Sequence, residues 1–319
     1  MKNRPHLAML SRHFYRAKAL QAVYAFRTSG SVDTAALDKS YTYHINHLNL
    51  LATLQLDALL RFVSITATMQ LEAKSKFMPT PDELNPSPNL SRNAFIARLQ
   101  ANYELSSRLE AVVPVPGVDA ILRKASRDYR ETTLYKQYAA LPKPTFADDK
   151  EQTLCLYKFL MNNEPLTYLF ASRSLLWEGD YHQVAQQGYA LLRTVNEDSP
   201  QDLPMPPVYD QRVPKERDDY LFGRQLMLET VHQFDSHRQL IEKHLHRWEY
   251  ERISLLDLII INMAIVELTT CPTIPALVTI DEYVELAKEF SSDKSRLFVN
   301  GIIDHIVADL RNQHLIEKD

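Results

Sequence analysis

Glycine is scarce in this sequence: only six of its 319 residues are glycine. A sustained alternation of apolar and polar residues is missing too, as is a glycine-rich loop of the kind that cradles phosphates. These absences argue against a doubly wound nucleotide-binding enzyme. Leu, Ala, Glu, Lys and Arg are abundant, and all five residue types favour helix. The sequence therefore predicts an all-α protein.

Cysteines and long apolar runs are also few. The two cysteines, Cys155 and Cys271, lack the spacing of metal ligands or redox motifs, which favours free thiols in a reducing cytoplasm. The longest apolar run, "LIIINMAIV" at 258–266, has nine residues. A helix of that length cannot cross a bilayer, so the run predicts a buried helix and no membrane association.

Acidic residues are absent from the first 30 positions, although the whole chain has a net charge of −4. The same stretch holds six basic residues, namely Lys2, Arg4, Arg12, Arg16, Lys18 and Arg27. A basic arm on an acidic body indicates a local site for a polyanion. An organelle-targeting leader would have a similar composition, but this arm also contributes an apolar helical face, which a removable leader usually lacks.

Helical periodicity and the positions of Pro and Gly predict the elements and their grouping. The expected helices are 8–28, 34–72, 90–111, 118–140, 147–162, 164–176, 181–195, 216–247, 253–269, 275–290 and 294–312. The segment 196–214 holds five prolines and is the best candidate linker. We expect three parts, at 1–72, 73–214 and 215–319. Asp33 and Ser292 are the expected N-caps of the second and the last helix.

Catalytic and metal-binding patterns find no support. His232, His237, His244 and His246 crowd one segment, but their spacing does not place three ligands on one helix face. We expect no metal, no cofactor and no enzymatic reaction.

The carboxy-terminal segments "VTIDEYVELAKEF" (278–290) and "SDKSRLFVNGIIDHI" (292–306) closely resemble the signature of the NusB transcription antitermination factors. The helix "WEYERISLLDLIIINMAIVEL" (248–268) and the segment "LSRHFYRAKALQAVYAF" (10–26) resemble the family's preceding helix and its Arg-rich first helix. Residues 73–214 lie outside the compact family pattern. Long-form members with a helical insertion after the first helices are the closest comparison.

This resemblance implies a pair of small helical bundles with a large helical insertion, and a protein that is not an enzyme. It implies binding to boxA-type single-stranded RNA together with the small-subunit ribosomal protein NusE. The pair would act on the RNA polymerase elongation complex indirectly, so that ribosomal RNA operons are read without premature termination.

The resemblance also implies where RNA binds. On the first helix, the matching RNA-binding positions and their neighbours are Arg12, His13, Arg16, Lys18 and Gln21. His13 and Phe14 depart from the family's basic pattern. Phe14 could stack on a base or pack in the core.

Three further RNA-binding positions lie at the start of the last helix: Lys294, Ser295 and Phe298. The alternative for Lys294 and Ser295 is a solvated lysine beside a capping serine. Asp257 matches an acidic position that faces the ribosomal protein, and it could equally hold a neighbouring helix through a buried polar contact. Asn262 replaces the arginine that is usual in the family.

An Asn-Gly pair, at 300–301, interrupts the last helix with a strong turn signal, yet the apolar spacing continues through it. We interpret Gly301 as a gap on the helix surface beside Phe298. The gap could admit an RNA base or allow close packing against the first helix.

Two other functions stay open at this stage. One is a helical protein-interaction scaffold without direct RNA binding, which the replacement of basic residues by His13 and Phe14 would suit. The other is an RNA methyltransferase, because a NusB-like domain precedes the catalytic domain in some of those enzymes. No cofactor loop or nucleophilic cysteine motif in this sequence supports the second.

Overall fold

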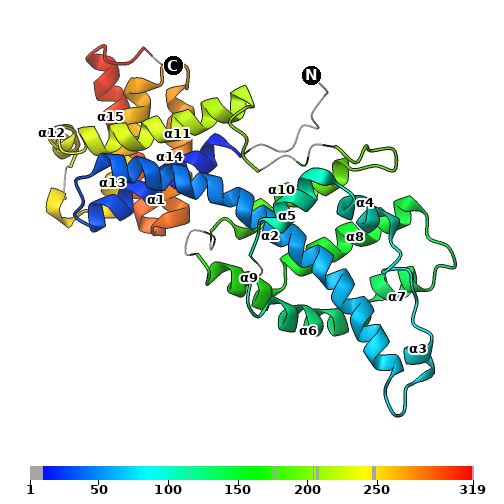
Figure 1. Ribbon diagram of the computed structural model, residues 1–319. Helices are drawn as coiled ribbons and strands as arrows, with labels where there is room; N and C mark the ends of the chain where they lie inside the picture. The colour runs from blue at the N-terminus through cyan, green and yellow to red at the C-terminus, as the bar shows by residue number, and fades with distance from the viewer. Residues whose placement is uncertain are drawn as a thin grey trace. The chain divides into compact units, whose positions relative to one another are not determined.

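The computed structural model describes residues 10–317 apart from 114, 175, 176, 178, 204, 206, 207 and 246–248. Within these ranges every regular element is a helix and no strand occurs (Figure 1). The predicted all-α class is therefore confirmed.

The chain divides into two compact units. We call Leu10–Tyr43 with Gln211–Asp319 the bundle unit, and His44–Asp210 the insertion unit. The first boundary lies inside the long helix α2 (Thr34–Lys74), and the second follows Asp210. The expected boundaries at residues 72 and 214 thus differ from this division, because most of α2 packs with the helices of the insertion.

The bundle unit is organised around one buried helix, α13 (Leu255–Thr270). All residues from 257 to 268 are buried, as expected for a helix that is apolar on every side. It contacts α1 (Arg12–Thr28), α11 (Pro214–Gln233), α14 (Ala276–Phe290) and α15 (Asp293–Asn312). The short α12 (Arg238–Lys243) packs on α15. The prediction of a buried helix at this position is confirmed.

Gly223 of α11 allows α1 and α11 to pack closely. A Cβ atom built on Gly223 would lie 2.8 Å from the Cβ of Tyr15, closer than two carbon atoms can pack. Tyr41 lies on the same side. Only a residue without a side chain fits there, so the two helices meet with their backbones close together.

The insertion unit contains the rest of α2 and a set of shorter helices: α3 (Pro81–Leu84), α4 (Ala94–Gln100), α5 (Tyr103–Glu110), α6 (Val118–Arg130), α7 (Thr133–Ala139), α8 (Phe146–Met161), α9 (Glu164–Ala171) and α10 (Tyr181–Thr194). Helix α8 contacts α4, α6, α7, α9 and α10. The buried Gln55 of α2 donates to the carbonyl oxygen of Tyr181 at 3.0 Å and accepts from the hydroxyl of Tyr157 at 3.3 Å. These bonds join α2 to α8 and α10.

Three predicted helices are each split in the structure, and in two of them a side-chain cap explains the break. The segment 90–111 forms α4 and α5, because the Asn102 side chain caps the backbone N–H of Leu105 at 2.9 Å. The segment 118–140 forms α6 and α7, where Thr132 caps Tyr135 in the same way. Short polar side chains bond the backbone and so start a new helix inside an apolar pattern.

The other predictions agree with the structure to within a few residues, with three exceptions. The segment 216–247 forms α11 and α12, α1 begins at Arg12, and α9 ends at Ala171, where the prediction extended to residue 176. Ser292 accepts from the N–H of Ser295 at 3.2 Å, and Asp33 accepts from that of Ala36 at 2.9 Å, so both predicted caps are confirmed. By length and apolar composition α2 could span a membrane, but most of its most apolar stretch is buried in the protein, as in a core helix.

Candidate functional site

The expected RNA-binding helix, α1, carries its first arginine beside an acidic residue of α11. The Arg12 Nε donates to Asp219 Oδ1 at 2.8 Å, and the guanidinium lies 5.1 Å from the centre of the Phe222 ring. The Arg12 side chain is still 46% exposed. Arg12 is therefore paired with a carboxylate but remains accessible to solvent.

Arg16 has a different environment, since its side chain is only 2% exposed. Its Nε and Nη2 donate to the two carboxylate oxygens of Glu267 at 2.7 Å each, and Nη1 lies 3.2 Å from Glu282. Burial by itself would lower the pKa of Arg16, but the hydrogen bonds and charge of Glu267 outweigh it and raise that pKa. Arg16 remains charged and belongs to the core, not to a surface that RNA can touch.

Glu267 completes a buried network across three helices. The carboxylate is fully buried on α13 and also accepts from the hydroxyls of Thr279 and Tyr283 on α14, each at 3.0 Å. With Arg16 from α1, every oxygen of the carboxylate has partners, which is what a buried charge requires. The network fixes α1 against α13 and α14.

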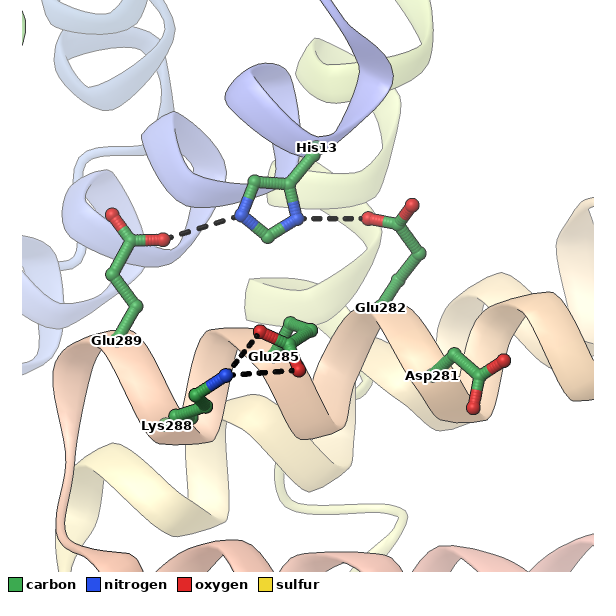
Figure 2. A pocket seen from close by; sticks show the side chains of 6 residues that line it. All are labelled: His13, Asp281, Glu282, Glu285, Lys288 and Glu289. Atoms are coloured by element: carbon green, nitrogen blue, oxygen red, sulfur yellow. Dashed lines mark hydrogen bonds and ion pairs between the residues drawn. The ribbon is translucent and has the colours of Figure 1, made fainter.

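His13 lies between two carboxylates of α14, as Figure 2 shows. Its Nδ1 is 2.9 Å from Glu282 Oε2, and its Nε2 is 3.2 Å from Glu289 Oε2. The hydrogen bond with Glu282 raises the pKa of His13 against the opposing effect of burial, and Glu289 raises it further. The hollow beside the ring is also lined by Asp281, Glu285 and Lys288. Its acidic walls do not suit a polyanion.

The two remaining candidates on α1 bond to each other. The Lys18 Nζ donates to Gln21 Oε1 at 2.9 Å and lies 5.4 Å from the centre of the Phe14 ring. Lys18 and Phe14 are both buried. The structure therefore supports core packing for Phe14, and the face of α1 expected to bind RNA is largely committed to contacts within the protein.

A second group of candidates meets where α13 and α15 begin. Asp257 is buried, and its two carboxylate oxygens accept from the hydroxyls of Ser291 at 2.9 Å and Ser295 at 3.0 Å. Of the two alternatives for Asp257, this geometry supports the polar contact that holds the turn between α14 and α15. It also brings Asp257 and Ser295 together, which the sequence did not indicate.

Beside Asp257 and Ser295 lies a hollow of about 270 Å³. Arg252, Lys294 and Phe298 line it as well. The two cations are exposed and the phenylalanine is half-buried. Sequence reasoning missed Arg252, although it lies in the matched segment 248–268, two residues before the Ser254 cap of α13. The arrangement places an aromatic side chain and two cations at one opening.

The glycine near this hollow has open space around it. A Cβ atom at Gly301 would meet nothing within 4 Å. Close packing against α1 is therefore excluded as its reason, and a gap beside Phe298 remains. Asn262 makes a structural contact, since its side chain bonds His237 Nδ1 at 3.0 Å and the carbonyl of Leu258 at 2.8 Å.

Comparison with known proteins gives a consistent result. The model of the NusB family matches residues 188–308. The chain is 38% identical over 109 residues to the transcription antitermination protein NusB of Salinibacter ruber, covering 34% of this chain and 68% of the relative. The proteins of that name in Myxococcus xanthus and Desulfatibacillum aliphaticivorans are 38% and 32% identical over 96 and 111 residues. The first of these matches covers 30% of this chain and 69% of the relative, and the second covers 35% of this chain and 78% of the relative. No solved structure matches the chain.

Proposed function

This chain belongs to the NusB family, and we propose that it is a cytoplasmic transcription antitermination factor that binds boxA-type single-stranded RNA together with ribosomal protein NusE. It acts without catalysing a reaction and reaches the RNA polymerase elongation complex only through these partners. Its relatives' names support the antitermination role. The RNA and the partner are proposals that rest on the geometry of the bundle unit.

The observation that carries the RNA proposal is the hollow at the start of α15. Phe298 offers its ring, and Arg252 and Lys294 stand at the same opening. Single-stranded RNA is bound by stacking bases on aromatic rings while cations hold the phosphates. The N–H groups at the start of α15 add a positive potential. The hydrogen bond from Ser295 to Asp257 fixes the position of the Ser295 side chain at the edge of this hollow.

The residues of α1 divide into two proposed roles. Arg12 contacts RNA, because it is the exposed arginine of that face. Arg16 and His13 hold α1 in place through their acidic partners. Lys18 and Gln21 affect RNA binding only indirectly, by stabilising α1, because their polar groups bond each other.

Asp257 is proposed to affect NusE through the turn that it holds. Its carboxylate fixes Ser291 and Ser295, so it determines the shape of the surface between α14 and α15. A basic ribosomal protein also gains from the negative charge nearby.

The test measures RNA affinity of the intact protein, with and without NusE, for a boxA-type RNA and a scrambled RNA of equal composition. We expect Phe298→Ala to weaken boxA binding about tenfold, since a stacked base contributes about 1–3 kcal/mol. Lys294→Ala should also weaken it and should reduce its salt dependence, because a phosphate contact is lost. Leu297→Ala is the matched control, because Leu297 is an exposed apolar neighbour on the same helix. Equal affinity for the two RNAs would overturn the proposal.

A second candidate function is a protein-interaction scaffold without direct RNA binding. The observation that favours it is the pairing of α1 cations with acidic residues, as in Arg12 with Asp219 and Arg16 with Glu267. A scaffold would bind NusE with normal affinity while showing no preference for boxA-type RNA, whether or not NusE is present.

A further inference from the structure

The insertion unit carries a line of basic side chains along the seam between α8 and α10. The helices run antiparallel there, because Lys150 near the start of α8 contacts Arg193 near the end of α10. Further along, Lys158 contacts Tyr189. Figure 1 shows the two helices in this unit, and their packing is direct.

Lys150 and Lys158 contact uncharged groups. Lys150 Nζ donates to the carbonyl oxygen of Arg193 at 2.7 Å and to Asn196 Oδ1 at 3.1 Å. Burial, and then the charge of Arg193, lower the pKa of Lys150. Among the residues that the structure describes, none of Lys150, Lys158 and Arg193 forms an ion pair. On α1, by contrast, Arg12 and Arg16 are paired.

A hollow of about 290 Å³ opens in the same seam. Its floor is buried and largely apolar, formed by Met161 and Ala185 together with the ring of Tyr157. Its rim is exposed and polar, formed by Asn162, His182 and Gln186. Lys158 and Tyr189 complete the wall, with the ammonium 4.4 Å from the ring centre.

The packing that creates the hollow depends on a glycine. A Cβ atom on Gly188 of α10 would lie 3.0 Å from Cζ of Tyr157 on α8, with the hydroxyl still closer. Gly188 thus lets α10 approach the buried tyrosine, and the rim residues of the two helices face each other across the opening.

We propose that this seam is a second binding site for single-stranded RNA, with one nucleobase in the hollow and phosphates on Lys150, Lys158 and Arg193. A base has flat apolar faces and polar edges, which match an apolar floor beneath carboxamide groups. Lys150 and Lys158 are eight residues apart, or about 12 Å along α8, so the line follows a strand of several nucleotides. An acidic peptide would satisfy the cations but leave the polar-rimmed hollow without a matching group.

The site deepens the proposed function and rests on it for the identity of the RNA, which is the transcript that the bundle unit binds. The RNA polymer would then contact both units. The proposal also gives the insertion unit a role. Because Arg12 and Arg16 of α1 are paired with carboxylates, the cations of α8 and α10 would supply additional contacts to the RNA phosphates.

The experiment uses the intact protein and a fluorescein-labelled single-stranded RNA of about 24 nucleotides with a boxA-type element near one end, long enough to exceed one binding site. The double variant Lys158→Glu/Arg193→Glu should weaken binding at least tenfold. It should also reduce the slope of log affinity against log salt by about 1.4, or about 0.7 for each lost phosphate contact. Lys124→Glu/Arg127→Glu on α6 is the matched control, with the same charge change at exposed positions.

The outcomes separate this site from the proposed function. If the seam variant binds like the control while Phe298→Ala loses affinity, the seam proposal is overturned and the proposed function stands. If only the seam variant loses affinity, the seam is supported and the hollow at α15 is not the RNA site. If the seam variant loses only the binding of a labelled polyglutamate peptide, the seam is a protein site instead.

A crosslinking measurement on the unmodified protein tests the same site without depending on whether the variant folds. Ultraviolet crosslinks from the same RNA to the peptide that contains His182 and Tyr189 are expected. RNA crosslinks confined to the bundle unit would overturn the seam proposal even if the double variant proved unstable.

Discussion

Replacing Arg16 by alanine should damage the fold of the bundle unit far more than any direct contact with RNA. The substitution would leave the Glu267 carboxylate fully buried without its guanidinium partner, although the hydroxyls of Thr279 and Tyr283 would still donate to it. Removing one partner of a buried ion pair typically costs about 3–5 kcal/mol, because the remaining charge is uncompensated. We therefore expect the free energy of unfolding of this unit to fall by about that amount.

Arg12→Ala is the matched control. Both arginines are on α1, and both have one main acidic partner and lie over the Phe222 ring. They differ in exposure, since the Arg12 side chain is 46% exposed and that of Arg16 only 2%. An exposed ion pair contributes about 0–1 kcal/mol, so Arg12→Ala should leave stability nearly unchanged.

The assay is hydrogen–deuterium exchange over a urea titration, followed on peptides from α13 and α14. These peptides report the bundle unit apart from the insertion unit, which matters because a chain with two units need not unfold in one step. A double variant, Arg16→Met/Glu267→Leu, should recover much of the lost stability, because apolar side chains of similar size can replace a buried ion pair.

The reasoning is refuted if Arg16→Ala lowers stability by no more than Arg12→Ala does. It is also refuted if Arg16→Ala reduces RNA affinity while exchange in α13 and α14 stays at the wild-type level. Arg16 would then be accessible to RNA, and its role in the core would be wrong.

Three further predictions concern the bundle unit. Gly301→Ala should stabilise it by about 0.5–1 kcal/mol, because the added methyl enters open space on a helix; loss of RNA affinity in this stable variant would show that a base uses the gap. Gly223→Ala should destabilise it by about 1–3 kcal/mol in the same urea titration, because α1 and α11 must move apart. His13 has a pKa raised above 6.5 by Glu282 and Glu289, so its stabilisation is complete below about pH 6.5 and is lost as pH rises through the raised value. His13→Gln should remove that decline in the urea midpoint as pH rises above about 6.5, and an unchanged decline would contradict it.

Local patterns in the sequence determined most of the helices. Apolar spacing predicted α13 as a buried helix, and Ser292 was identified as the cap of α15 from its type and position. Two of the three missed helix breaks occur because Asn102 and Thr132 interrupt the pattern with a single side-chain bond to the backbone. The sequence position of one polar residue in an apolar segment does not predict whether its side chain caps a helix or points to solvent.

Contacts between distant residues decided the candidate site. Arg12 and Arg16 have the same charge and lie on the same predicted helix, and nothing local distinguishes them or shows what the neighbouring His13 contacts. Their partners Asp219, Glu282 and Glu267 lie more than 200 positions away. Whether a cation is free for a ligand depends on which acidic residue the fold places beside it and on how much water remains there.

The sequence by itself thus determined the helices, the apolar core and the family, because these depend on periodicity and on short motifs. Only the tertiary structure decided that Arg16 is buried, that Asp257 holds a turn, and that Lys158 meets Tyr189 across two helices. The physical reason is that burial and charge compensation are properties of packed neighbours, and packing joins residues that the linear order keeps apart.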